Sequence, residues 1–152
     1  YIGPSVTTFS YLNPSYRIYT VDGSYNGTSW QVLDHETYIM NLTEANKSKR
    51  KAPVWYKEYS AKEAYNLSTV YPEDWQGLLN RMKTNDTLLQ QYCKYKYKLR
   101  AGVTCDREQT LCAIKSARSH DPSLCADLFP PNMTATQLYS AHALWQRQHK
   151  QC

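Results

Sequence analysis

The side chains that could bind a metal or transfer protons are spread thinly along this sequence. Its four histidines are His35, His120, His142 and His149. The run Asp34-His35-Glu36 has the composition of a site that holds a cation and activates water. Successive strand residues point to opposite faces, however, so the two carboxylates and the imidazole should diverge. His142 and His149 are too far apart along a helix to share one ion. We therefore interpret His35 as structural and expect neither a catalytic residue nor a metal ligand in this chain.

Acceptors for N-linked glycans are more frequent than chance predicts. The 8 Asn and the 25 Ser plus Thr among 152 residues would give about one acceptor triplet if they were placed at random. Six triplets occur, and they begin at Asn26, Asn41, Asn46, Asn66, Asn85 and Asn132. This excess predicts passage through the secretory pathway, and coincidental triplets on an Asn-rich surface are the alternative. No run is apolar and long enough to span a membrane.

The cysteines agree with an oxidising compartment, although their spacing does not choose a pairing. There are five of them: Cys93, Cys105, Cys112, Cys125 and Cys152.

Two basic runs and a formal charge of +5 suit an anionic partner. The first is Lys47-Ser48-Lys49-Arg50-Lys51, and the second is Lys94-Tyr95-Lys96-Tyr97-Lys98-Leu99-Arg100, in which cations alternate with aromatic rings. Such a composition can bind phosphates and stack on bases, but no nucleic-acid motif accompanies it. We expect Lys47, Lys49, Arg50, Lys51, Lys94, Lys96, Lys98 and Arg100 to face anionic lipid. Protonation of all four histidines would raise the charge to +9 in acid and strengthen this attraction.

The first sixty residues are predicted to form strands. Tyr1 to Phe9 is extended but contains Gly and Pro, which indicates a strand that runs out into a loop. Residues 16–21 alternate apolar and polar side chains like a half-buried strand, and after a Gly-containing hairpin loop residues 31–40 are predicted to return as the next strand. Residues 42–46 predict one helical turn, and residues 54–59 predict an edge strand. Three strands without a covering layer have no complete core, so this part needs the rest of a sheet.

From about residue 60 the pattern becomes helical. Ser60 to Glu63 has the form of a capping box, and Pro72 precedes an apolar stripe at helical spacing. Further helices are predicted to begin near residue 85 or 86, at Asp121-Pro122, and at Thr134, where Gln137 completes a capping pattern. The sequence therefore predicts an α+β fold with two parts, residues 1–59 and residues 60–152.

Two stretches resemble a known family. Leu33-Asp34-His35-Glu36-Thr37-Tyr38-Ile39, with Asn41-Leu42-Thr43 and Ala45-Asn46 after it, is similar to a run near the C-terminal end of the acid sphingomyelinases. These are zinc-dependent phosphodiesterases of the calcineurin-like metallophosphoesterase family. Pro4-Ser5, Leu12-Asn13-Pro14 and Asp22-Gly23 stand in the order found just after the last metal-binding histidine motif of that family.

The resemblance implies a fold and a function. Residues 1–59 would be the terminal antiparallel strands of a metallophosphoesterase sheet, and a disulfide-containing helical part would follow. The full-length parent would hydrolyse sphingomyelin to ceramide and phosphocholine with two zinc ions. The family's metal signatures are missing from this sequence and would lie before Tyr1, so the chain alone should be inactive. Its partners would be the N-terminal catalytic portion, sphingomyelin and an anionic lipid surface, in a secreted or lysosomal setting.

Particular residues follow from the same resemblance. The family's loop corresponding to Thr7–Asn13 lies near the substrate cleft, which makes Phe9, Tyr11 and Asn13 candidates for lining it. The implied bridge is Cys112–Cys125, with Cys93 as the substitute partner of Cys105 and Cys152 unpaired. Two alternatives stay open. One is a related phosphodiesterase that acts on nucleotides, and the other is a secreted basic module that binds anionic lipid or polyanions without catalysis.

Overall fold

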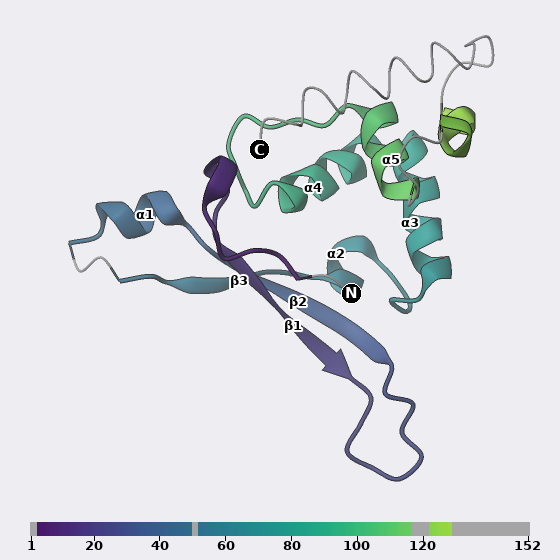
Figure 1. Ribbon diagram of the computed structural model, residues 1–152, viewed down its shortest axis with the longest axis horizontal. Helices are drawn as coiled ribbons and strands as arrows, with labels where there is room; N and C mark the ends of the chain where they lie inside the picture. The colour runs from purple at the N-terminus through teal and green to yellow at the C-terminus, as the bar shows by residue number, and fades with distance from the viewer. Residues whose placement is uncertain (1–2, 50–51, 117–121, 129–152) are drawn as a thin grey trace. The chain divides into compact units, whose positions relative to one another are not determined.

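Three strands and several short helices follow one another along the chain (Figure 1). The computed structural model describes residues 3–49, 52–116 and 122–128. The elements are a 3-10 turn η1 (Phe9–Tyr11), β1 (Ser15–Val21), β2 (Val32–Met40), α1 (Leu42–Lys47), β3 (Trp55–Ser60), α2 (Ala61–Tyr65), α3 (Pro72–Thr84), α4 (Asp86–Lys96), α5 (Arg107–Lys115) and a 3-10 segment η2 (Pro122–Leu128). Strands followed by helices confirm the predicted α+β class.

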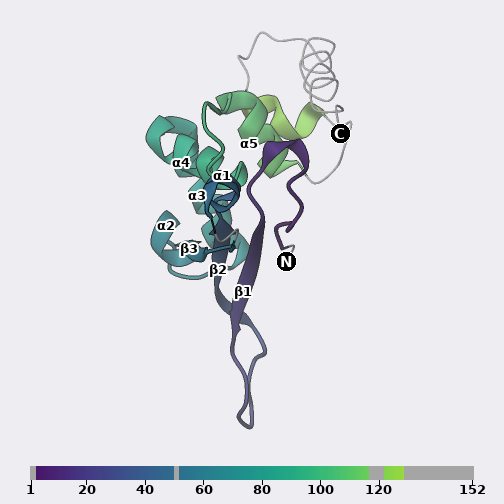
Figure 2. The same cartoon turned by 90° about the vertical axis from the view of Figure 1, so that its left-hand side faces the viewer.

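The strands form one antiparallel sheet in the order β1-β2-β3. β1 pairs with β2 along its whole length, with Ser15 opposite Ile39 at one end and Val21 opposite Val32 at the other. β3 pairs only with residues 36–40 of β2. The β1–β2 ribbon and its hairpin loop therefore run on past β3 (Figure 2). The strand predicted over residues 31–40 is confirmed by β2, and from His35 on every second side chain of it is buried: His35, Thr37 and Ile39.

A β-bulge interrupts the pairing of β2 with β3. Thr37 lies opposite Tyr59 and Tyr38 lies opposite Lys57, so Glu58 has no partner residue on β2. Bulges of this kind re-aim side chains. Before the bulge Tyr59 lies opposite the buried Thr37, and Arg17 donates hydrogen bonds to both side chains.

The chain divides into two compact units, and α3 and α4 each contribute to both. The first unit comprises residues 1–78 and 92–103. Its core joins aliphatic side chains to a cluster of aromatic rings: His35, Tyr59, Tyr65, Trp75, Tyr92 and Tyr95. Tyr59 stacks on Tyr95 with ring centroids 4.2 Å apart. Its hydroxyl accepts a hydrogen bond of 3.1 Å from Arg17 Nη2. The Tyr59 hydroxyl thus has a polar partner within a core rich in aromatic rings.

The second unit comprises residues 79–91 and 104–152. In its described part, Leu79, Met82, Leu89, Leu111, Cys112 and Cys125 form the core. A disulfide joins Cys112 in α5 to Cys125 in η2, as the resemblance implied. Asp127 forms ion pairs with Lys83, at 2.8 Å, and with Lys115. Covalent and ionic links therefore hold η2 to the helices.

The N-terminal segment and α5 depart from the sequence prediction. Among residues 3–8 there is no strand, so the predicted strand over Tyr1 to Phe9 is wrong for this described part. The Ser5 carbonyl accepts one hydrogen bond of 3.1 Å from the Ser15 amide, and Pro4 has no amide hydrogen with which to extend a ladder. Conversely, α5 was not predicted, although Asp106 caps it by accepting a bond of 2.9 Å from the Gln109 amide.

Other predictions concern the helical part. α3 and α4 begin where the stripes predicted. The Ser60–Glu63 capping box is replaced by a 3.3 Å hydrogen bond between the two side chains, without a side-chain cap on the backbone. The helix predicted at Thr134 lies outside the described residues. The division into residues 1–59 and 60–152 stays a prediction.

Candidate functional site

The turn η1 is held by an asparagine that binds the backbone on two sides. Asn13 Nδ2 donates to the Lys98 carbonyl oxygen at 2.8 Å, and its Oδ1 accepts from the Leu42 amide at 3.1 Å. One side chain therefore links the segment after η1 to the start of α1 and to the segment after α4. Because both ends of its amide are used, Asn13 can position a substrate-lining loop but has little left with which to bind a ligand.

The two aromatic residues of η1 are displayed to solvent. Phe9 is 61% exposed and Tyr11 is 87% exposed, and Tyr11 has a φ of 62°. The Arg100 guanidinium carbon lies 5.8 Å from the centroid of the Tyr11 ring, within cation–π range. We call Phe9, Tyr11 and Arg100 the aromatic–basic edge. Rings beside cations at a surface suit a lipid–water interface that carries phosphate groups.

The second basic run does not form one solvated face. Lys98 and Leu99 have positive φ values of 53° and 57°, and this left-handed pair ends the helical path of α4. Lys98 is partly buried whereas Lys94 and Arg100 are exposed. Burial lowers the pKa of Lys98. The run is therefore divided, since Arg100 lies over Tyr11 while Lys94 and Lys98 interact electrostatically with Glu58.

Glu58 carries a buried carboxylate group in β3. Both of its carboxylate oxygens are inaccessible to solvent and lack a hydrogen-bond partner among the described residues. Burial raises the pKa of Glu58 to about 7, although Lys98, Lys94 and Arg17 oppose this shift. Glu58 is thus neutral in acid and becomes charged near neutral pH, next to two lysines of the basic run.

The first basic run lies at the end of α1. Lys47 and Lys49 are exposed, while Arg50 and Lys51 lie outside the described residues. That the two runs face lipid stays a prediction.

The Asp34-His35-Glu36 run does not fit a zinc ion. The imidazole of His35 is 4% exposed and stacks on Trp75 with centroids 6.1 Å apart. Asp34 Oδ1 accepts from the Lys62 amide at 3.2 Å, and Glu36 pairs with Lys57 at 2.6 Å. Across the part of the chain that the structure describes, no group of three or more His, Cys, Asp or Glu could hold a metal. The zinc that the family implies finds no ligand set here.

The charge that acid adds differs from the expected +9. Burial lowers the pKa of His35 to about 4, with a further contribution from the nearby Arg17 charge. His35 therefore stays neutral at pH 5, and the expectation that it gains a charge is corrected. The other three histidines lie outside the described residues. Protonation of Glu58, which sequence reasoning missed, removes a negative charge in the same pH range.

Five of the six glycan acceptors lie in the described part. Asn26, Asn46, Asn66 and Asn85 are exposed and Asn41 is partly buried, while Asn132 lies outside. Cys93 and Cys105 are disulfide-bonded, and Cys152 lies outside the described residues. That Cys93 and Cys105 are joined to each other stays a prediction, as does the attachment of glycans.

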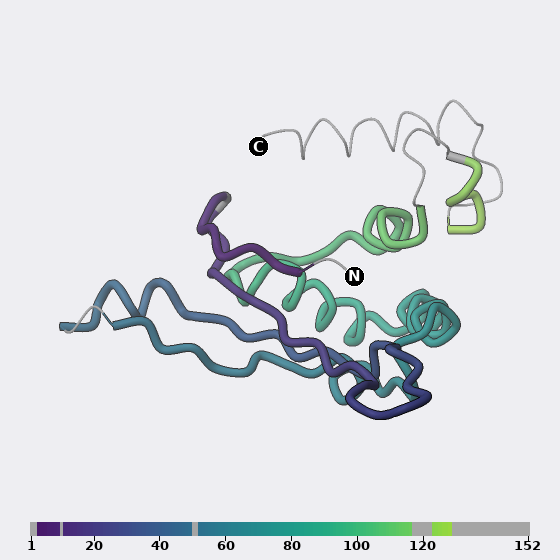
Figure 3. The backbone as a smooth tube through the Cα atoms, turned by 60° about the horizontal axis from the view of Figure 1, so that its bottom comes forward, coloured from purple at the N-terminus to yellow at the C-terminus, as the bar shows by residue number. Residues whose placement is uncertain are grey.

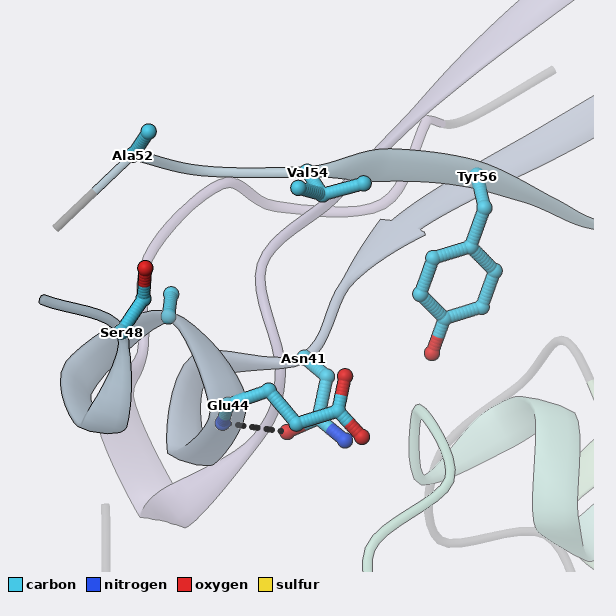
Figure 4. Close-up of a pocket in the computed structure, with 7 residues that line it drawn as sticks. Asn41, Glu44, Ser48, Ala52, Val54 and Tyr56 are labelled. Carbon is cyan, nitrogen blue, oxygen red and sulfur yellow. Dashed lines mark hydrogen bonds between the residues drawn. The ribbon is translucent and has the colours of Figure 1, made fainter. Parts of the chain in front are cut away.

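A hollow of about 230 Å³ lies between α1 and the segment that leads into β3. Asn41, Ala45, Val54 and Tyr56 are among its lining residues (Figure 4). Sequence reasoning missed this feature because it depends on how a helix and a strand segment lie side by side (Figure 3). It also missed Glu58 and the pairing of Arg100 with Tyr11. The only signal for Glu58 was an acidic residue inside a strand pattern.

No helix among the described residues is both long enough and apolar enough to traverse a bilayer.

Comparison with known proteins found a family model, described as the acid sphingomyelin phosphodiesterase C-terminal region, that matches residues 3–127. The chain is 43% identical over 150 residues to sphingomyelin phosphodiesterase of Bos taurus, covering 95% of this chain and 23% of that protein. It is 41% identical over 152 residues to sphingomyelin phosphodiesterase of Homo sapiens, with 97% and 23% covered. It is 39% identical over 133 residues to sphingomyelin phosphodiesterase 2 of Caenorhabditis elegans, with 84% and 21% covered. The chain thus spans less than a quarter of the length of these relatives.

Proposed function

The chain belongs to the acid sphingomyelin phosphodiesterase family, as a C-terminal region, and from this premise we propose that it is the non-catalytic end of a larger sphingomyelin phosphodiesterase. The whole enzyme hydrolyses sphingomyelin to ceramide and phosphocholine, and it is secreted or lysosomal. Its zinc centre, with two ions as the resemblance implies, lies in the N-terminal portion of the polypeptide. The match to a C-terminal region, which covers 23% of the Bos taurus relative, supports placing the catalytic centre elsewhere in the polypeptide.

The observation that carries a lipid-directed role is the aromatic–basic edge. Tyr11, at 87% exposed, has the most exposed large apolar side chain in the described part, and Arg100 lies over its ring. Aromatic rings partition to the lipid–water interface, and arginine pairs with phosphate groups there. We infer that this edge contacts the lipid surface from which the substrate is drawn.

The uncovered face of the sheet suits a second partner, the N-terminal catalytic portion. Tyr16 stacks on Tyr38 with centroids 5.2 Å apart, and Trp55 lies 5.1 Å from Tyr16. Tyr16 and Trp55 are both 36% exposed, and Ile18 on the same strand is 47% exposed. An apolar patch of this kind marks an interaction surface. We propose that the rest of the enzyme covers it.

Sphingomyelin is the substrate that the comparisons favour over a nucleotide. The relatives named above carry the name sphingomyelin phosphodiesterase and share 39–43% identity with this chain. Two of them match almost its whole length.

Vesicle assays on the full-length parent test the lipid-directed role. Replacing Lys94, Lys96 and Lys98 with Gln should weaken binding to vesicles of sphingomyelin and anionic lipid about tenfold, because each lysine near such a surface contributes up to about 1 kcal/mol. Arg100→Gln should act in the same direction. Turnover of a soluble substrate analogue should not change.

A matched control is Arg81→Gln, which removes the same charge from an exposed position on α3. It should leave vesicle binding as it is. Equal losses of vesicle binding in the Arg81 and Arg100 variants would show that only the net charge matters. Vesicle binding that does not change with salt or pH would show that the basic runs are only a solvated face.

A further inference from the structure

The helix α1 is short and buries nothing. It has six residues, and none of its side chains is buried. Isolated helices of this length are marginal in water. Two hydrogen bonds fix its start: Asn41 Oδ1 accepts from the Glu44 amide at 3.2 Å, and Asn13 Oδ1 accepts from the Leu42 amide at 3.1 Å. The side of α1 that faces β3 therefore offers room for a ligand that would complete the packing.

The hollow beside α1 has one apolar wall and a polar rim. Val54 is 70% exposed and Tyr56 is 38% exposed, while Glu44 and Ser48 supply polar groups from α1. An exposed tyrosine ring flanked by hydrogen-bonding groups suits an amphipathic ligand with one apolar face. A pyranose sugar has this character, since its C–H groups gather on one face and its hydroxyls lie around the edge.

Asn41 stands at the rim of this hollow and begins an acceptor triplet, Asn41-Leu42-Thr43. Its cap to the helix uses Oδ1, so Nδ2, the atom that carries an N-linked glycan, is not needed for the cap. Figure 4 shows Asn41 and Glu44 at the start of α1 facing Tyr56 across the hollow. The hydrogen bond of the cap also restricts the direction in which a glycan on Nδ2 would leave.

We propose that this hollow seats the innermost N-acetylglucosamine of an N-linked glycan on Asn41, with the apolar sugar face against Tyr56 and Val54. The glycan is transferred from a lipid-pyrophosphate donor: Nδ2 bonds to C1 of the sugar, the bond from C1 to the pyrophosphate oxygen breaks, and Nδ2 loses one proton. The inference rests on the secretory passage included in the proposed function. The sugar then packs against α1 and stabilises it, as buried side chains stabilise other helices.

The test uses the full-length protein secreted from eukaryotic cells. Glycopeptide mass spectrometry should find Asn41 occupied. Enzymatic release of that glycan from the native protein should be about tenfold slower than release at Asn26, because the sugar must first leave its seat. Asn26 lies in the exposed hairpin loop and serves as the internal control. Tyr56→Ala should keep Asn41 occupied but bring its release to the rate at Asn26.

Two variants separate the glycan from the helix cap. Asn41→Asp keeps an N-cap oxygen, and Thr43→Ala keeps Asn41 itself, yet both abolish the acceptor. Each should lower the melting temperature by about 3 °C or more and speed amide exchange in α1, whereas Asn26→Asp should do neither. Equal release rates at Asn41 and Asn26, or an empty Asn41 beside an occupied Asn26, would overturn the seat alone. Glycans missing from every acceptor would overturn the secretory passage and the seat together.

Discussion

Two buried titratable residues give the fold opposite responses to acid. For His35 the pKa of about 4 in the folded chain lies below the value of about 6.5 for an unfolded histidine. The unfolded chain therefore binds more protons between these values, and the stability that neutral His35 provides is lost as pH falls from about 6.5 to 4. Each pKa unit corresponds to about 1.4 kcal/mol, so the loss reaches at most about 3 kcal/mol.

Glu58 acts in the other direction. Its pKa of about 7 lies above the usual value, so the folded chain binds more protons. The stability from protonated Glu58 is fully present below about pH 4.5 and is lost as pH rises towards 7. After allowance for screening by solvent, this effect is about 2 kcal/mol. The two residues largely offset each other between pH 4.5 and 6.5.

We predict that Glu58→Gln stabilises the chain by about 2 kcal/mol at pH 7 and has little effect at pH 4.5, because Gln needs no proton to stay neutral. Urea unfolding at both pH values measures this. Without Glu58, the loss due to His35 should dominate, so that the variant becomes less stable on acidification. The control Glu73→Gln changes an exposed acid in the first turn of α3. A gain for Glu58→Gln that is equal at both pH values would contradict the raised pKa.

At the scale of elements, the sequence predicted the strands and helices whose residues follow a local pattern. The strand pattern that ends at Tyr38-Ile39-Met40 predicted β2, and the stripe that includes Trp75 and Leu78 predicted α3. The strand predicted over residues 1–9 is wrong for the described residues 3–8, because β propensity does not supply a pairing partner and Pro4 cannot donate to one. The bulge at Glu58 could not be predicted, since register depends on contacts across strands.

The candidate site shows the same limit. Resemblance pointed to Phe9, Tyr11 and Asn13 as a group, but the structure gives Asn13 a different task from that of its neighbours. Its two backbone partners, Lys98 and Leu42, are distant in sequence. Local sequence patterns do not predict contacts between residues that are distant in sequence. The cation–π contact between Arg100 and Tyr11 could not be predicted for the same reason.

The Cys112–Cys125 bridge should matter for the helical elements that it joins. Its cysteines are 13 residues apart, and closing a loop of that length stabilises by about 3 kcal/mol in the chain-entropy model. We predict that replacing both cysteines with Ser lowers the free energy of unfolding by about this amount, as measured by urea titration. A loss below about 1 kcal/mol would mean that the ion pairs of Asp127 already hold η2 in place.

The remaining cysteines give a second prediction for these elements. Peptide mapping without reduction should find Cys93 joined to Cys105, and Cys152 as a free thiol. Both Cys93 and Cys105 are oxidised. A peptide that joins Cys152 to either of them would refute the pairing.

At the scale of the whole molecule, the isolated chain should fold without the activity proposed for the larger enzyme. We predict that the isolated chain retains no stoichiometric zinc after dialysis and does not hydrolyse labelled sphingomyelin, because Asp34, His35 and Glu36 are engaged in other contacts and no metal-holding group occurs among the described residues. Metal analysis, a substrate assay and circular dichroism on one preparation would check this. Tight zinc binding by the folded chain would contradict the placement of the metal centre in the N-terminal portion.

The interleaved make-up of the two units has a consequence for biosynthesis. Residues 92–103 complete the first unit, yet they are translated after residues 79–91, which belong to the second. A nascent chain emerges in sequence order, so the first unit cannot close until at least residue 103 has left the ribosome. During that interval Asn41 and the other glycan acceptors near the N-terminus belong to a unit that has not finished folding. A glycan can therefore reach Asn41 before α1 and β3 come together around it.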